Sequence, residues 1–464
     1  MSTQDARRPL TPEGARERVA DKCFPPTAPT DGPGLIGLEP ELFAYQTDED
    51  GTPRGRVPLQ HVLEVLRKLT EQRHDLKVGN PSPPSFLIEG GGSLTFEPGA
   101  QIEHSTRPYS SGAEALQNTR DVFCMLQRAL GAHGISLASS GVDLFYGHED
   151  VPQQLDAARY HCMAEYFDRR GPHGRTMMRL TASQQVNLDL GDEHVRRERW
   201  LAAYLASPLA TVSFSTSPGD GVVNARAVAW QGLDPTRSGY PASLVDGSTD
   251  DPIEQYTRAA LAADVMLFWT EDGKAVTGTP GFSFEQWMRD GHPEFGHPTL
   301  ANFDYHLTTL FLEVRPRGSF EIRSTDALPS PWLTAPVVLW TGLLYDDRAR
   351  SQALDTLQGI RSRLPERWAT AARIGFADAE LLELATSVWN NALEGARRLP
   401  AGYFSAAGLE TTEQFLETFV RRGQSPSDQL RQVLARGRAH ALAWAVGDPR
   451  CPGVADGLPS GLTV

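Results

Sequence analysis

Apolar and polar residues alternate in several short stretches of the chain, which is the spacing typical of β-strands. Such stretches predict strands at residues 35–45, 94–104, 177–190, 309–315 and 319–323. A turn of proline, arginine and glycine between the last two predicts that they pair, and the proline-rich residues 81–85 are expected to form a loop.

A helical spacing of apolar residues appears at residues 59–69, 113–130 and 193–209, and it dominates the chain beyond Pro331. Three helices are expected in that last region, at residues 333–344, 378–397 and 426–446. Because strands come first and helices follow, instead of alternating with them, the pattern predicts an α+β protein with an antiparallel sheet.

The two ends of the chain differ from its centre. Residues 1–34 contain an amphipathic patch near residues 13–23 and then a link rich in proline and glycine. We expect an N-terminal helix and linker there, followed by a single catalytic domain at residues 35–447 and a tail at residues 448–464.

The composition suits a protein with a substantial core, because 40% of its 464 residues are hydrophobic and 22% are charged. The formal net charge of −14 argues against general nucleic-acid binding, which needs a basic surface. The sequence shows no signal peptide and no apolar run of transmembrane length, and its four cysteines are scattered like reduced thiols. We therefore expect a cytoplasmic protein that binds neither membranes nor nucleic acid.

Acidic residues recur at strand spacing in two segments. In GLEPELF, Glu39 and Glu41 lie two positions apart and would share one face of the strand. In SLTFEPGAQIEHS, Glu97, Gln101 and Glu103 would also share a face if the strand stays regular. A bulge at the Pro-Gly between them would break this pattern.

Two later segments carry similar residues. Glu321 and Arg323 share a face of SFEIRS, and Gln185, Asn187 and Asp189 share a face of SQQVNLDL. Oxygen ligands of this kind suit Mg²⁺ better than Zn²⁺. Spacing leaves the alternative open that the acids lie on solvated strand faces and that the Glu–Arg pair is a surface ion pair.

Several familiar catalytic motifs are missing from the sequence. It contains no GxxxxGK[ST], no GxGxxG that opens a helix, no nucleophile elbow and no HExxH. The EGGG at residues 89–92 could bring backbone amides near a phosphate, although a flexible turn is the simpler interpretation. Lys274 lies in EDGKAV, which lacks the P-loop spacing and is expected to be a surface turn.

The chain resembles the glutamate–cysteine ligases of the plant-type and actinobacterial ergothioneine-pathway group. The matching blocks occur in one order along residues 20–444, so that the resemblance covers nearly the whole chain. They are ADKCF, GLEPELF, SLTFEPGAQIEHST, ARYHCMAEYF, MMRLTASQQVNLDLG, ARAVAWQGLDPTRSG, HLTTLFLEVRPRGSFEIRSTDALP, PWLTAPVVLWTGLLYDD and SPSDQL.

The resemblance implies a fold like that of glutamine synthetase, in which a curved antiparallel sheet forms a funnel surrounded by helices, with a helical C-terminal third. It also implies a reaction that depends on ATP and Mg²⁺. ATP would phosphorylate the γ-carboxylate of glutamate, and the amine of cysteine would attack the γ-glutamyl phosphate to give γ-glutamylcysteine for ergothioneine biosynthesis. Such chemistry rests on positioned charges and needs no side-chain nucleophile.

The matching motifs also imply roles for individual residues. The residues expected to hold Mg²⁺ are Glu39, Glu41, Glu97, Glu103, Gln185 and Glu321. Arg226, Arg237 and Arg323 match positions that contact glutamate or the transferred phosphoryl group, and Arg237 and Arg323 are expected to act in catalysis. For Arg323, an ion pair with Glu313 or another residue of the sheet is the structural alternative.

Two departures from the family pattern bear on these expectations. The first strand reads EPE, and because proline donates no hydrogen bond, this strand should lie at a sheet edge or lose one bond at Pro40. The segment at residues 218–224 is shorter and less aromatic than the family pattern leads us to expect. Because this loop could bear on the pocket for the acceptor amine, the assignment of cysteine is less secure than that of glutamate. The alternatives are a γ-glutamyl ligase for another amine, or an inactive relative that binds glutamate or nucleotide.

Overall fold

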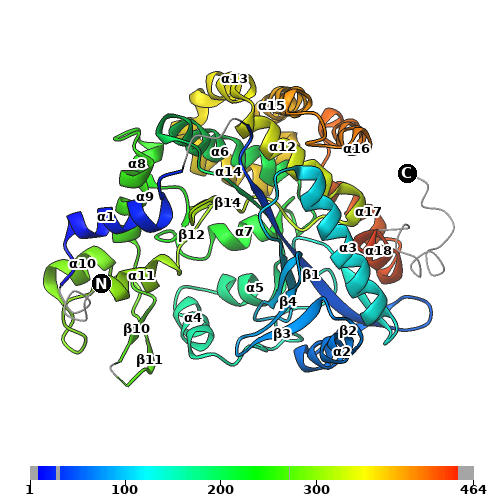
Figure 1. Ribbon diagram of the computed structural model, residues 1–464, viewed down its shortest axis with the longest axis horizontal. Helices are drawn as coiled ribbons and strands as arrows, with labels where there is room; N and C mark the ends of the chain where they lie inside the picture. Colours follow the sequence, from blue (N-terminus) through cyan, green and yellow to red (C-terminus); the bar gives the residue numbers. More distant parts are fainter. Residues whose placement is uncertain (1–8, 28–31, 271, 448–464) are drawn as a thin grey trace.

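The computed structural model describes residues 9–27, 32–270 and 272–447, which form an α+β structure around a large antiparallel sheet (Figure 1). The strands follow the order β13-β14-β8-β1-β6-β5-β4-β3, and β2 and β7 also pair with β1. Their bounds are β1 Ile36–Thr47, β2 Pro53–Arg56, β3 Leu76–Pro81, β4 Pro84–Ile88, β5 Gly92–Phe96, β6 Ile102–Ser105, β7 Ile135–Ala138, β8 Gln184–Leu188, β13 Val314–Pro316 and β14 Phe320–Ile322.

Two small sheets lie beside the large one. β10 (Leu267–Trp269) and β11 (Ala275–Thr277) form an antiparallel hairpin, and β9 (Ser238–Gly239) pairs in parallel with β12 (Phe311–Leu312). Lys274 is exposed in the turn of the hairpin, as the sequence predicts.

The helices surround the sheet. Figure 1 shows α12, α13, α15 and α16 gathered with α6 at the top of the view, while α2 and α3 lie beside the end of β1 that pairs with β2. The helices are α1 Pro12–Cys23, α2 Leu59–Gln72, α3 Gly112–Gly131, α4 Ala158–Asp168, α5 His173–Leu180, α6 Glu193–Ser213, α7 Ala225–Gln231, α8 Ala242–Val245, α9 Pro252–Ala262, α10 Phe284–Asp290, α11 Leu300–Leu307, α12 Thr334–Tyr345, α13 Asp347–Leu357, α14 Leu364–Arg373, α15 Ala379–Arg398, α16 Ala406–Thr418, α17 Pro426–Leu434 and α18 Arg438–Val446.

β1 is a central strand of the large sheet. Its N-terminal half pairs with β8, its middle with β6, and its C-terminal half with β7 and β2. Pro40 faces Gln184 inside this ladder, so that the prediction of an edge strand is wrong. The other alternative holds, because the proline removes one donor from a ladder that is otherwise paired on both sides.

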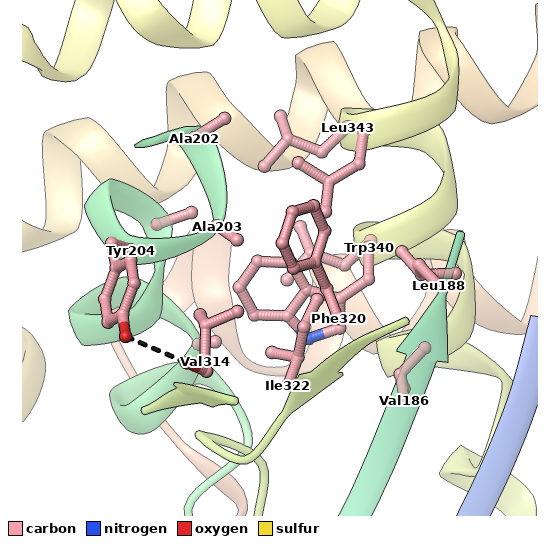
Figure 2. Close-up of a cluster of buried hydrophobic side chains, with 14 of the residues drawn as sticks. Val186, Leu188, Ala202, Ala203, Tyr204, Val314, Phe320, Ile322, Trp340 and Leu343 are labelled. Carbon is pink, nitrogen blue, oxygen red and sulfur yellow. Dashed lines mark hydrogen bonds between the residues drawn. The ribbon is translucent and has the colours of Figure 1, made fainter. Parts of the chain in front are cut away.

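The faces of β8 and β14 have opposite character. Figure 2 shows their apolar side chains turned toward α12, where Trp340 and Leu343 pack against them. These strand residues, all buried, are Val186, Leu188, Phe320 and Ile322. Because side chains alternate along a strand, the intervening Gln185 and Glu321 face the opposite side. The helix α6 belongs to the same layer, since the Tyr204 hydroxyl donates to the carbonyl oxygen of Val314 (2.8 Å).

Several predicted elements differ from the structure. Residues 94–104 form two strands, β5 and β6, joined by a turn, and the first part of residues 177–190 belongs to α5. The predicted loop at residues 81–85 is the turn of the β3–β4 hairpin together with the residues beside it. The predicted helix at residues 426–446 is divided at Gly437, whose φ of 125° no helix contains. The predicted strand at residues 309–315 is divided into β12 and β13, which belong to different sheets. The remaining predicted strands and helices are present at their places.

The expected N-terminal helix is present as α1. Arg18 donates two hydrogen bonds to the carboxylate of Asp304 (2.7 and 2.6 Å), which hold α1 against α11. The tail expected at residues 448–464 lies outside the described residues, and the domain boundaries stay a prediction.

Cys23 and Cys162 are free and buried, as expected of reduced thiols. Cys124 is disulfide-bonded, so the expectation of a reduced thiol is wrong for this cysteine. In the described ranges, no helix is both long and apolar enough to cross a membrane.

The backbones of α12 and α15 approach closely at Gly342. A Cβ atom on Gly342 would lie 2.0 Å from the carbonyl oxygen of Ala392, so that Gly342→Ala must push the two helices apart. We expect this substitution to lower the free energy of unfolding by about 1–3 kcal/mol, the usual cost of overpacking a core, as measured by urea denaturation.

Gly131→Ala, at the end of α3, is the matched control. No atom lies within 4 Å of the position that its Cβ would take. Because alanine has the higher helix propensity, this variant should be neutral or more stable by about 0.5–1 kcal/mol. Equal destabilisation of the two variants would contradict the close-approach argument.

Candidate active site

A cavity of about 590 Å³ opens on the polar face of the large sheet. Its acidic and polar wall includes Glu39, Glu41, Glu97, Gln101, Glu103, Ser105, Thr181, Ser183, Gln185 and Thr308, and its basic wall is Lys22, Arg159, Arg226, Arg315, Arg317 and Arg323. The predicted metal ligands all line this cavity except Glu321. The reading of the acids as solvated strand faces is wrong for Glu41 and Glu321, which are 8% and 0% exposed.

The sheet register brings the acids together. Glu41 lies directly opposite Glu103 on β6, and Glu39 lies directly opposite Gln185 on β8. Side chains opposite one another in antiparallel strands have their Cβ atoms about 5 Å apart, so that like charges there repel each other. These four side chains, Glu103 of β6, Glu41 and Glu39 of β1 and Gln185 of β8, are called the acid row below.

Glu97 extends the acid row from the turn between β5 and β6. The backbone N–H of Glu97 donates to the carbonyl oxygen of Gln101 (3.0 Å), and Ala100 adopts a φ of 64°. The turn packs tightly on α5, since a Cβ atom on Gly99 would lie 2.2 Å from the carbonyl oxygen of Arg179. The regular strand is thus absent and the predicted break at Pro98-Gly99 is present, as a turn that still directs Glu97 into the cavity.

Burial and mutual repulsion among the carboxylates raise the pKa values of Glu39, Glu41 and Glu97. Burial, followed by repulsion from Glu103 and Glu321, raises the pKa of Glu39 to about 8. Burial and Glu103 also raise the pKa of Glu41 to about 7, and burial with Glu103 and Glu41 raises the pKa of Glu97 to about 8. The acid row therefore retains protons near neutral pH or requires a cation beside it.

Hydrogen bonds orient part of the acid row. Ser183 donates to Glu41 from its hydroxyl (2.7 Å) and its backbone N–H (3.1 Å), and Thr95 donates to Glu103 (2.7 Å). The carboxylates of Glu39 and Glu97 accept no hydrogen bond from the part of the chain that the structure describes. These two carboxylates have the most capacity for a ligand.

Glu321 lies behind the cavity wall and holds three arginines. Its carboxylate contacts Arg315 (2.7 Å), Arg317 (3.0 Å) and Arg323 (2.6 Å), all of which line the cavity. Burial by itself would raise the pKa of Glu321, but these arginines outweigh burial and lower the pKa to about 2. Its position therefore supports a role in placing arginines and not the expected role as a metal ligand.

Arg323 and Arg226 line the cavity side by side. Arg323 donates to Oε1 of Gln185 (3.1 Å), and its guanidinium lies 5.0 Å from the ring centre of Trp230. Its ion-pair partner is not Glu313 but Glu321 of β14, so the structural alternative holds for another residue of the sheet. Arg226 donates to the backbone carbonyl oxygen of Arg323 (2.9 Å).

Arg237 does not reach the cavity. Its side chain is fully buried and donates to Asp234 (2.8 Å), to the carbonyl oxygen of Thr309 (2.8 Å) and to the carbonyl oxygen of Asp264. The structure thus gives Arg237 a structural role, because its donors serve neighbouring loops, and it does not support the expected contact with substrate.

The sequence did not single out four of the cations that line the cavity, namely Arg159, Arg315, Arg317 and Lys22. Strand parity could have found Arg315, because it pairs directly with Glu321 across β13 and β14. Arg159 and Lys22 come from α4 and the end of α1, and no local pattern places these helices beside the sheet.

The oxygen atoms of the acid row are suitable ligands for a metal ion, although their side chains do not converge on one point. In the described ranges, no three His, Cys, Asp or Glu side chains converge as a metal site. The donors are oxygen atoms, and the raised pKa values of Glu39 and Glu97 show that their negative charge lacks compensation. Oxygen donors with uncompensated charge suit a hard divalent cation such as Mg²⁺.

Comparison with known proteins places these features in a family. The family model described as glutamate-cysteine ligase family 2 matches residues 35–445. The glutamate–cysteine ligase EgtA of Mycolicibacterium smegmatis is 34% identical over 423 residues, which cover 89% of this chain and 90% of that protein. The chloroplastic glutamate–cysteine ligase of Nicotiana tabacum is 29% identical over 444 residues, which cover 92% of this chain and 80% of that protein.

A solved structure shares the fold. The crystal structure of the glutamate–cysteine ligase from Francisella tularensis in complex with AMP matches with a TM-score of 0.52 and 12% identity, over 93% of this chain and 92% of that one. The expected fold class, a glutamine-synthetase-like antiparallel sheet surrounded by helices, is thereby confirmed.

The raised pKa of Glu97 makes stability depend on pH. From the usual value of 4.5 up to about 8, folded Glu97 keeps a proton that unfolded Glu97 releases, so that stability falls as pH rises through this window. Glu97→Gln removes this penalty. We expect the variant to melt at a higher temperature than the parent near pH 8.5 in EDTA, with a difference that vanishes toward pH 5.

The control is Glu89→Gln, because Glu89 is an exposed acid in the turn between β4 and β5. It should change the melting temperature little at either pH. A Glu97→Gln protein that is less stable than the parent near pH 8.5 would contradict the electrostatic account.

Proposed function

The chain belongs to glutamate–cysteine ligase family 2, and on this basis we propose that it joins the γ-carboxylate of glutamate to the amine of cysteine with ATP as co-substrate. The observation that carries this proposal is the cavity in which the acid row faces a group of arginines. Residues 35–447 would form the catalytic domain, and Lys22 and Cys23 of α1 would complete its wall.

Different arginines act on the two acids of β1. The charges of Arg315 and Arg317 act on Glu39, whereas those of Arg226 and Arg323 act on Glu41. Arg315 and Arg317 suit the phosphates of ATP, and Arg226 and Arg323 suit the carboxylates of glutamate. Guanidinium groups can donate two parallel hydrogen bonds to either group, so they can orient the γ-carboxylate toward the phosphate.

The residues that would hold Mg²⁺ are Glu39, Glu41, Glu97, Glu103 and Gln185. A bound ion would neutralise charge on the phosphate oxygens. Its positive charge would also offset the repulsion within the acid row. Glu321 would keep the arginines in place from behind.

The apolar side of the cavity supports cysteine as the acceptor. Met163, Met177 and Met178 line it together with Trp230 and Phe311. Polarisable thioether and aromatic surfaces suit a small thiol side chain. None of residues 218–224 lines the cavity, so the shortness of that segment gives no argument against cysteine.

Two alternatives make different predictions. A ligase for another amine would use the same acids and arginines and would differ on the apolar side. An inactive relative that binds glutamate or nucleotide is disfavoured, because the acids and the arginines of the cavity are all present.

The direct test is release of ADP from ATP with Mg²⁺ and glutamate, with and without cysteine, together with mass spectrometry of the product. We expect ADP release that depends on cysteine and a product with the mass of γ-glutamylcysteine. An equimolar panel of amino acids and amines is the control. A better acceptor than cysteine would support the first alternative, and ligand binding without turnover would support the second.

Arg323 tests the role of the guanidinium fork. Lysine keeps the charge but cannot contact Gln185, Glu321 and a substrate oxygen in the same plane. We expect Arg323→Lys to lower kcat/KM for glutamate by about 10- to 100-fold, the scale of a misplaced reacting group. Arg175→Lys alters an exposed ion pair outside the cavity and should leave kcat/KM unchanged. Parent-like kinetics of Arg323→Lys would contradict a contact between the guanidinium of Arg323 and the substrate.

A further inference from the structure

Arg226 reaches the cavity from α7, and the residues behind it hold it in place. Its Nη2 donates to the carbonyl oxygen of Arg323 (2.9 Å), and its Nη1 lies 3.6 Å from Oδ1 of Asp326. We propose that Asp326 is the positioning residue for Arg226 and fixes the guanidinium that meets the substrate. This inference rests on the proposed function, because it assigns the geometry of a residue in that site.

Asp326 is fully buried, and its two oxygens have different roles. Oδ2 accepts hydrogen bonds from the backbone N–H of Thr216 (2.9 Å), from the hydroxyl of Ser217 (2.5 Å) and from Nδ2 of Asn224 (3.3 Å). Oδ1 is buried and accepts no hydrogen bond from any described residue. The nearest cation to Oδ1 is therefore the guanidinium of Arg226, which compensates the buried charge.

The same group of residues fixes the start of α7. Asn224 caps the helix by accepting the backbone N–H of Ala227 (2.7 Å), and the N–H of Arg226 donates to the hydroxyl of Ser217 (3.3 Å). Both Asn224 and Ser217 also donate to Asp326. Asp326 thus sets the place of the helix that carries Arg226 and the direction of the guanidinium itself.

The surrounding chain leaves room for this carboxylate and little else. A Cβ atom on Gly141 would lie 2.2 Å from Oδ2 of Asp326, so that residue 141 must be glycine for the carboxylate to sit there. A close fit of this kind holds the oxygens of Asp326 in one position.

Asp326→Asn removes the negative charge of residue 326 but keeps nearly the same side-chain shape. The amide keeps an oxygen for Thr216 and Ser217, but it no longer attracts Arg226. We expect kcat/KM for glutamate to fall by about 10- to 100-fold, because a small displacement of a substrate contact has effects on this scale. The KM for ATP should stay within about twofold of the parent value, since Arg226 acts on Glu41, whereas Arg315 and Arg317, the arginines proposed for the phosphates, act on Glu39.

Asp378→Asn is the matched control. Asp378 also lies beside a buried guanidinium, that of Arg367 (3.3 Å), and neither residue lines the cavity. Asparagine can still cap α15 at this position. This variant should show parent-like kinetics for both substrates, even if its melting temperature falls as far as that of Asp326→Asn.

A double-mutant cycle with Arg226→Gln distinguishes positioning from a general structural role. The measured quantity is the dissociation constant of glutamate by calorimetry, which does not require turnover. If Asp326 acts through Arg226, Asp326→Asn should weaken glutamate binding in the parent but change it less than about twofold in Arg226→Gln.

Two results would overturn the inference. One is parent-like kinetics of Asp326→Asn, and the other is an equal loss of glutamate affinity in both backgrounds, which is the signature of a structural role alone. Failure of the proposed function would look different, because the parent protein itself would then neither bind glutamate nor release ADP.

Discussion

The acid row imposes the electrostatic constraint on which the rest of the site depends. Glu41 and Glu103 face each other across a strand pair, Glu39 lies two residues along the same strand, and Glu97 joins them from a turn. These carboxylates lie in a partly dehydrated cavity, so they cannot all be ionised without a compensating cation. The surrounding arginines only partly offset this repulsion, since the pKa values of Glu39 and Glu97 remain near 8.

The fold resists this repulsion through the opposite face of the sheet. The apolar side chains of β8 and β14 pack on α12, and Tyr204 ties α6 to the same layer (Figure 2). Behind the cavity wall, Glu321 and Asp326 form a second set of acids whose partners are arginines instead of other acids. The acids nearest the cavity are thus poorly compensated and ready for ligands, while those behind them are paired and hold the arginines.

Local patterns predict much of this arrangement. Strand alternation was sufficient to place Glu39 and Glu41 on one face, and the succession of strands and helices predicted the α+β class. The Pro-Gly pair indicated a break in the strand after Glu97, but not that the turn directs Glu97 inward, because this depends on the contact of Gly99 with Arg179 of α5, far away in the sequence.

The roles of the arginines depend even more on tertiary contacts. Arg237 and Arg226 both lie in one matching motif, yet one is buried among loops and the other faces the cavity. The difference comes from their partners, Asp234 beside Arg237 and Asp326 a hundred residues beyond Arg226. Likewise, α1 supplies Lys22 although it lies outside the segment that the family model matches.

The most direct test of this account is calorimetry of Mg²⁺ binding to the nucleotide-free protein near pH 7, in two buffers with different ionisation enthalpies. If a divalent cation compensates the charge of the acid row, Mg²⁺ should bind and displace protons from the carboxylates with raised pKa values. The released protons are taken up by the buffer, so the apparent enthalpy of binding should differ between the two buffers. Absence of binding, or binding with the same enthalpy in both buffers, would contradict the claim that a divalent cation relieves the repulsion in the acid row.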